Sequence, residues 1–249
     1  MVVKFATATD VGLQRKNNED CSVVLNDANF CAVADGMGGH LAGEIASHIA
    51  IETLVAAFKD HNGSVGNNER KDAELLTKTI KAANREIYRR GNAEAALRNM
   101  GTTIVAAVVI SDYVVTANVG DSRIYRLRDN DFTQVTEDHS WVGELRKKNL
   151  ISAEDARTHP LKNIITRALG MEPAVEVDVR WDKVKPGDVY LLCSDGLTDL
   201  VPDDEIKGVM LKHKGDLTAM AQNLIAEANS AGGSDNVTVG LARVDEVAS

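Results

Sequence analysis

The chain has 249 residues, a formal net charge of −9 at pH 7, and 44% hydrophobic residues. This length can bury a substantial core as one domain, and no linker rich in proline, glycine and serine divides it. The acidic balance and the lack of a basic stripe argue against nucleic acid as the main partner, because such binding depends on clustered Lys and Arg.

β-rich runs, alternating or continuous, predict strands along most of the chain. Several neighbouring runs are joined by very short turns such as Ser111-Asp112, whereas a parallel pair needs a crossover of a dozen residues or more. The sheets are therefore predicted to be antiparallel. The strands are expected at residues 2–9, 22–25, 30–34, 102–110, 113–119, 123–127, 132–135, 175–181, 189–193 and 237–244.

Two pairs of helices interrupt these strands. Apolar residues recur at helical spacing over 43–58 and 69–90, and Gly91 is suited to the C-terminus of the second helix. Pro202 fits the first turn of a helix that runs to Lys212, and Asp216 is suited to cap a helix that follows.

Each helix has one apolar face that a sheet would have to cover. Two antiparallel sheets, each covered by a helical pair, would use every element. We therefore predict an α+β fold, a four-layer α-β-β-α sandwich formed by a single domain over 1–249. The low aromatic content implies a core of Val, Ile, Leu and Ala, and residues 61–68 are interpreted as a loop between helices.

The compartment is predicted from what the sequence lacks. The longest apolar run, 104–110, is far too short to span a bilayer, and the N-terminus lacks the apolar core of a signal peptide. The three cysteines are odd in number, and Cys31 and Cys193 lie in apolar runs, which favours buried free thiols over disulfides or a zinc cluster. We expect a soluble, cytoplasmic monomer.

Three aspartates, Asp35, Asp195 and Asp235, stand where apolar strands meet tight turns. A carboxylate at such a rim is costly unless it is solvated, paired or bound to a cation. Any one of them alone is explained as a turn residue that accepts hydrogen bonds from backbone amides. Together they predict one site for hard metal ions.

The glycines after Asp35 resemble a phosphate-binding loop only superficially. The segment Asp35-Gly36-Met37-Gly38-Gly39-His40 lacks the Lys-Ser/Thr ending of a P-loop and the spacing of a dinucleotide fingerprint. Upstream, Arg15 precedes the acids Glu19 and Asp20. Arginine offers a planar fork of donors that matches phosphate oxygens, and adjacent carboxylates can hold metal-bound waters.

Five segments occur in a fixed order. They are Arg15-x-x-Asn18-Glu19-Asp20, Asp35-Gly36-Met37-Gly38-Gly39-His40, Gly120-Asp121-Ser122-Arg123, Ser194-Asp195-Gly196-Leu197-x-Asp199 and Gly233-x-Asp235-Asn236. In their order and in their residues they resemble the motifs of the metal-dependent serine/threonine protein phosphatases of type 2C, particularly the compact bacterial members. The resemblance covers about residues 3–244 and implies a β-sandwich flanked by helical pairs, in agreement with the elements above.

The resemblance also implies roles for individual residues. Asp35 would bridge two Mn²⁺ or Mg²⁺ ions, Gly36 would lend its backbone carbonyl, and Asp195 and Asp235 would bind one of the pair. Oxygen ligands suit such hard cations. A hydroxide that bridges the metals would attack phosphorus in line, and Arg15 would hold the phosphoryl group in register.

Further acids surround this core in the resemblance. Glu19 and Asp20 would orient the second metal and its waters. Asp121 would help to hold a third metal beside the one bound at Asp195. For Asp199, a structural hydrogen bond at a helix start explains the residue as well as metal contact does.

The sequence leaves open which group acts as the general acid. Animal members of the family carry a histidine where this chain has Met37, and a thioether cannot deliver a proton. His40 could take that role, although a histidine at a helix start more often caps or packs. A metal-bound water is the other candidate.

Residues 136–170 would form a flap beside the metals, and long insertions on a rigid scaffold often govern substrate choice. Ser152 opens a capping-box pattern there. The alternative is an ordinary helical connector in which His139, His159 and Trp141 pack, and none of these three is assigned to catalysis.

The sequence thus predicts hydrolysis of phosphoserine and phosphothreonine on proteins, with phosphorylated proteins, including a bacterial serine/threonine kinase, as partners. One rival is a catalytically silent module that keeps the fold, but Arg15, Asp35, Gly36, Asp195 and Asp235 are all present. The other rival is a metal-dependent hydrolase of small phosphate esters or nucleotides, which an open metal cleft does not by itself exclude.

Overall fold

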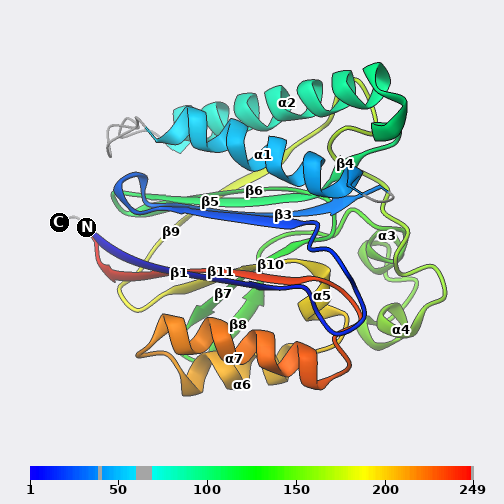
Figure 1. Ribbon diagram of the computed structural model, residues 1–249. Coiled ribbons are helices and arrows are strands. Elements are labelled where there is room, and N and C mark those ends of the chain that lie inside the picture. Colours follow the sequence, from blue (N-terminus) through cyan, green and yellow to red (C-terminus); the bar gives the residue numbers. More distant parts are fainter. Residues whose placement is uncertain (39–40, 60–68, 248–249) are drawn as a thin grey trace.

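The computed structural model describes residues 1–38, 41–59 and 69–247. Two antiparallel sheets stack face to face, and a pair of helices covers the outer face of each (Figure 1). The predicted four-layer α-β-β-α sandwich is confirmed. Within the described residues, none of the helices has the length and apolar character needed to cross a membrane.

The upper sheet in Figure 1 has the strand order β2-β3-β5-β6-β9, with β4 paired to β3. The turn between β5 and β6 is the short Ser111-Asp112 connection, in which Ser111 has a left-handed φ of 53°. The strands of this sheet are β2 (Asp20–Leu25), β3 (Phe30–Met37), β4 (Gly101–Thr102), β5 (Ile104–Ile110), β6 (Tyr113–Val119) and β9 (Asp178–Lys183).

The second sheet has the order β1-β11-β10-β7-β8. Its strands are β1 (Val2–Asp10), β7 (Arg123–Arg128), β8 (Asp131–Gln134), β10 (Val189–Cys193) and β11 (Val237–Glu246). The first and last strands of the chain are neighbours, and Asp10 stands opposite Val237 in their register. The loop that follows β1 and the turn that precedes β11 therefore emerge at the same end of the sandwich.

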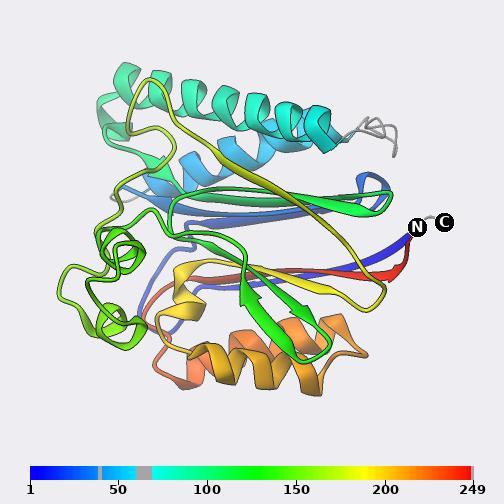
Figure 2. The same cartoon turned by 180° about the vertical axis from the view of Figure 1, so that it is seen from behind.

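The helices divide into two covering pairs and a group at one end (Figure 1). The pair on the six-stranded sheet is α1 (Ala42–Phe58) and α2 (Glu69–Ala93), and the pair on the other sheet is α6 (Asp203–Lys212) and α7 (Leu217–Ser230). At the end lie α3 (Trp141–Lys147), α4 (Ala153–Thr158) and the short α5 (Asp195–Thr198). Figure 2, the view from behind, shows β9 running below α2.

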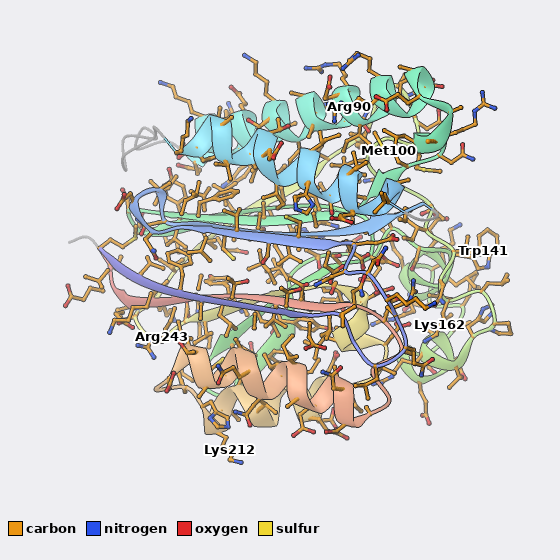
Figure 3. The ribbon with its side chains drawn as sticks, in the orientation of Figure 1. Arg90, Met100, Trp141, Lys162, Lys212 and Arg243 are labelled. Carbon is orange, nitrogen blue, oxygen red and sulfur yellow. The ribbon has the colours of Figure 1, made fainter. Side chains whose placement is uncertain are left out.

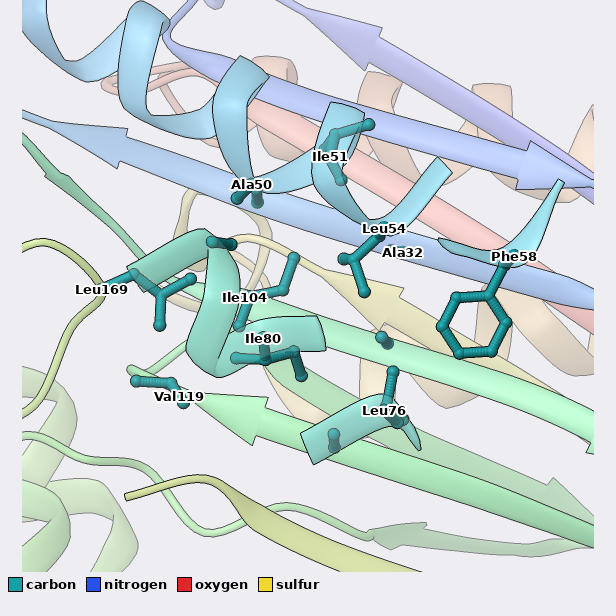
Figure 4. Packing of buried hydrophobic residues seen from close by; sticks show 14 of the residues in the cluster. Ala32, Ala50, Ile51, Leu54, Phe58, Leu76, Ile80, Ile104, Val119 and Leu169 are labelled. Atoms are coloured by element: carbon teal, nitrogen blue, oxygen red, sulfur yellow. The ribbon is translucent and has the colours of Figure 1, made fainter. Parts of the chain in front are cut away.

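The apolar core has three layers. Under α1 and α2, residues such as Leu54, Leu76 and Ile104 are fully buried, as Figure 4 shows. A second layer lies under α6 and α7, and a third lies between the sheets, where Val105 and Leu192 meet. Burying each such side chain contributes about 1.5–3 kcal/mol. The expected core of Val, Ile, Leu and Ala is confirmed.

Several local expectations are corrected. Gly91 does not end its helix, because α2 continues to Ala93; a Cβ at Gly91 would lie 3.3 Å from the Leu97 carbonyl oxygen, so the glycine allows the next turn to approach closely. The strand expected at 175–181 is shifted to Asp178–Lys183. The predicted cap is confirmed at Asp216, whose Oδ1 accepts a 3.0 Å bond from the Ala219 amide.

Two further expectations are confirmed, and a third lies outside the described residues. The Ser152 capping box is present as predicted, and Cys31 and Cys193 are buried free thiols. The loop expected at 61–68 lies outside the described residues.

Candidate active site

One end of the sandwich gathers the predicted acids from both sheets. Asp35 lies within β3, one residue beyond the predicted strand, and Asp20 stands opposite it on β2. From the other sheet, Asp195 begins α5 directly after β10, and Asp235 lies just before β11. Because both sheets end here, acids far apart in the sequence face one another.

Asp35 is fixed by its backbone. Its amide donates to Thr103 Oγ1 at 3.1 Å, and its carbonyl accepts from the Thr103 amide and from Thr102 Oγ1, both at 2.8 Å. Burial, and then the charges of Asp20 and Asp195, raise the pKa of the Asp35 carboxyl well above its ordinary value. The fold therefore holds this carboxyl where its ionised form is unfavourable unless a cation lies beside it.

Gly36 is required by close packing of backbone. A Cβ at this position would lie 2.2 Å from the Gly43 carbonyl oxygen and 2.6 Å from the Glu19 carbonyl oxygen. The Gly36 amide also donates to that Glu19 oxygen at 3.2 Å. The absence of a side chain thus lets β3, α1 and the Glu19 loop meet beside Asp35.

Asp195 and Asp121 form the other half of the cluster. Burial, and then the charges of Asp121 and Asp199, raise the pKa of Asp195 well above its ordinary value. Burial and the charge of Asp138 raise the pKa of Asp121 to about 7. Gly120 turns the chain into Asp121 with a φ of +108°, a conformation that suits glycine. Asp121 Oδ1 is buried and has no hydrogen-bond partner within the described residues.

Asp20 connects the two sheets. Its Oδ2 accepts a 2.8 Å bond from Ser194 Oγ, and Ser194 Oγ accepts a 3.0 Å bond from the Thr238 amide. Burial raises the pKa of Asp20 to about 6, although hydrogen bonds from the Thr238 and Ser194 side chains oppose the shift. Within the described residues Asp20 Oδ1 is also buried without a partner. Sequence reasoning gave Ser194 no role of its own.

Arg15 lies at the solvent-facing rim. Its Nη2 donates to Asp235 Oδ2 at 2.7 Å, and the two side chains are 51% and 35% exposed. Partial burial raises the pKa of Glu19, and the Arg15 charge opposes that rise. A guanidinium that is half exposed beside a carboxylate is accessible to an incoming anion.

Asn236 is a residue whose role sequence reasoning missed. It is 5% exposed, its Oδ1 accepts from the Glu19 amide at 2.8 Å, and its Nδ2 donates to the Val11 and Asn17 carbonyls at 2.9 Å each. One side chain thus fixes the loop that carries Arg15. The available signal was a polar residue entering a buried strand directly after Asp235.

Residues 136–170 lie against this end of the molecule and are anchored through His139. The His139 amide donates to the Gly120 carbonyl at 2.9 Å, and His139 Nδ1 accepts from the Gly120 amide at 3.0 Å. The His139 carbonyl accepts from the Thr166 amide at 2.8 Å. His139 is buried, as a packing residue should be, whereas Trp141 is 45% exposed.

A cavity of about 620 Å³ separates this segment from the acids. Lys162 crosses it, since its Nζ lies 2.7 Å from Asp199 Oδ2, and Asp199 is therefore held in an ion pair. Figure 3 shows Lys162 and Trp141 at this end of the molecule. The lining includes Asp121, Arg146, Arg157, Lys162, Asp195 and Asp199.

The cluster suits hard dications even though it is not a closed cage. In the described part of the chain, no three His, Cys, Asp or Glu side chains form a ready coordination group. Mg²⁺ and similar ions retain several waters and need few protein ligands, so such a group is not required. The orphaned oxygens of Asp20 and Asp121, and the raised pKa values of Asp35 and Asp195, fit bound cations. His40 lies outside the described residues.

Comparisons with known proteins agree with this arrangement. Residues 14–235 match the family model of protein phosphatase 2C. The serine/threonine phosphatase stp of Listeria monocytogenes serotype 4b is 45% identical over 240 residues, which cover 95% of this chain and 94% of that protein.

Solved structures give the same result. The Mycobacterium tuberculosis serine/threonine phosphatase PstP/Ppp is 36% identical, with a TM-score of 0.90 over 99% of this chain and 100% of that one. The catalytic domain of PstP in complex with 2 manganese ions is also 36% identical, with a TM-score of 0.88 over 98% and 99% of the two chains. This chain belongs to the protein phosphatase 2C family of serine/threonine phosphatases.

Proposed function

We propose that this chain is a divalent-metal-dependent phosphatase that removes phosphate from phosphoserine and phosphothreonine on proteins. The observation that carries the proposal is the convergence of Asp20, Asp35, Asp121 and Asp195, all with raised pKa values, from two different sheets beside Arg15. Burial of several carboxyls that repel one another is typical of a site for cations. Family membership supports the reaction.

Asp35, Gly36, Asp195 and Asp235 would hold two Mn²⁺ or Mg²⁺ ions, a number supported by the two manganese ions of PstP. Two such ions would supply a water activated for in-line attack on phosphorus and would offset charge on the phosphoryl group. The carboxylates must be ionised to bind the ions, so their raised pKa values link binding to pH. Asp121, with Asp195, would hold a third ion.

Arg15 would bind and orient the phosphoryl group. Its half-exposed guanidinium can exchange its contact with Asp235 for phosphate oxygens, because it offers several donors in one plane. Glu19 and Asp20 would orient waters around the site. His40 or water would protonate the leaving oxygen, and a His40→Gln variant that lost the basic limb of the pH–rate profile would select His40.

The chain would act as one catalytic domain over 1–249, with residues 136–170 as its flap. The contacts of His139 and Lys162 support a flap whose position is tied to the acids. Phosphoproteins are the substrates, and the bacterial relatives support a serine/threonine kinase as the opposing enzyme. The buried free thiols of Cys31 and Cys193 support a reducing cytoplasm.

The test is phosphate release from a phosphothreonine peptide and from a nucleotide, with and without Mn²⁺. The native chain should turn over the peptide only with metal, and Asp195→Asn should lower kcat/KM by about 100-fold, or about 2.7 kcal/mol of transition-state stabilisation. Asp216→Asn is the control, because asparagine also caps α7 away from the site. Mn²⁺ binding without turnover would select the silent-module rival, and cleavage of the nucleotide alone would refute the substrate class.

A further inference from the structure

A second recess lies away from the acids, on the outer face of the six-stranded sheet. It is a groove of about 460 Å³ between α2 and β9, which lies below that helix in Figure 2. Val179 and Trp181 line it from β9, and side chains of α2 line it from above. The proposed catalytic reaction uses none of these residues.

Trp181 gives the groove an apolar surface. It is 48% exposed, and its neighbour on the same face of β9, Val179, packs against the core under α2. An indole exposed to this degree offers a large contact area at a small cost in side-chain entropy. Such a residue in a recess is typical of an interaction surface.

The α2 side of the groove is strongly basic. Arg70, Lys78, Lys81 and Arg85 line it against the single acid Glu74. Lys78, Lys81 and Arg85 are exposed, and within the described residues they form no ion pair. This is a local reversal of charge on a chain whose formal net charge is −9. An acidic partner would be attracted here and repelled elsewhere.

β9 also provides unpaired backbone. It is the last strand in the order of its sheet and pairs only with β6 in the described structure. An edge strand presents free amide and carbonyl groups to which an extended peptide can bind. The groove therefore combines backbone, aromatic and cationic contacts along one line.

We propose that this groove docks an extended acidic segment of a phosphoprotein substrate, an inference that rests on the proposed phosphatase function. A short acidic segment senses mainly the local cations, because charges are screened over about 8 Å at physiological ionic strength. The backbone edge of β9 also favours a peptide.

The position of the groove sets the spacing between the docked segment and the phosphorylated residue. Trp181 stands opposite Val115 on β6, and Asp121 follows the end of that strand, six residues after Val115. At about 3.3 Å per residue, this places Trp181 roughly 20 Å from the acids. A flexible linker of about twelve residues has a matching root-mean-square length, whereas about three residues span only about 10 Å.

Binding is measured first, without catalysis. A fluorescein-labelled peptide of about ten residues, Asp and Glu with one Leu, is titrated with the protein and followed by anisotropy. Lys78→Glu/Lys81→Glu and Trp181→Ala should each weaken binding about tenfold, or about 1.4 kcal/mol. Lys207→Glu/Lys212→Glu, with the same change in charge on α6, should leave binding unchanged.

The proposal would be overturned if the α6 control lost as much affinity for the acidic peptide as the α2 variant, or if a single-stranded DNA of equal charge bound more tightly than the peptide.

Catalysis is measured next on a phosphothreonine peptide alone and on the same peptide joined to the acidic segment on either side. The twelve-residue linker should raise kcat/KM about tenfold through effective concentration, the three-residue linker should not, and Lys78→Glu/Lys81→Glu should remove only the gain. If the plain peptide is hydrolysed and joining it to the acidic segment by either linker does not raise kcat/KM, the docking proposal is refuted. No hydrolysis of the plain peptide refutes the phosphatase function instead, and the binding measurement then still decides whether the groove takes an acidic segment.

Discussion

Replacing Asn236 by alanine removes three hydrogen bonds that hold the Arg15 loop in place. Each such bond contributes about 0.5–1.5 kcal/mol net, and the Glu19 amide would be left without its acceptor, so the free energy of unfolding should fall by about 2–4 kcal/mol. The larger effect is on catalysis. A displacement of the Arg15 guanidinium by about 1 Å should lower kcat/KM about 100-fold.

Urea unfolding and phosphopeptide kinetics measure the two effects. Asn223→Ala is the matched control, because among the described residues Asn223 bonds only to Ala219 of its own helix α7, and it lies away from the site. If Asn236 acts by positioning Arg15, then Asn236→Ala should cost little more kcat/KM in an Arg15→Ala background than Arg15→Ala costs alone. Full additivity of the two losses, or native kcat/KM in Asn236→Ala, would refute this reasoning.

Three further predictions concern the carboxylates. Gly36→Ala should weaken Mn²⁺ binding in calorimetry, because the added Cβ would lie 2.2 Å from the Gly43 carbonyl oxygen and must push β3 away from α1; unchanged affinity would contradict the packing argument. Ser194→Ala should lower the free energy of unfolding by about 1–3 kcal/mol, since Asp20 Oδ2 and the Thr238 amide both lose their partner, and an unchanged urea midpoint would count against it. The pKa values of Asp20 and Asp121 are raised from 3.8 to about 6 and about 7. Their protonated carboxyls therefore contribute stability to the metal-free fold below pH 3.8. This contribution to stability is lost as the pH rises through 6 to 7. The rise in Tm on adding Mn²⁺ should therefore grow over the same interval, and a rise independent of pH would be the contrary result.

The sequence predicted the layers well because antiparallel strands with short turns leave few ways to cover the apolar faces. It also singled out Asp35, Asp195 and Asp235, which the fold brings close together, since an acid that ends an apolar run is visible locally. The roles of Asn236 and His139 were not visible, because their partners are backbone groups of distant loops. Gly91 misled for a similar reason: it lies inside its helix, where a Cβ would lie 3.3 Å from the carbonyl oxygen of Leu97 in a later turn.

The distribution of the site over both sheets has a consequence for the chain as it is synthesised. A nascent polypeptide that has been made only as far as α7 already contains Arg15, Asp35, Asp121 and Asp195, yet it lacks Asp235, Asn236 and the strand β11 that lies between β1 and β10. Without β11 and the residues before it, the loop after β1 lacks the three hydrogen bonds to the Asn236 side chain. The activity should therefore appear in one step late in synthesis, and an incomplete chain could not remove phosphate from proteins around the ribosome.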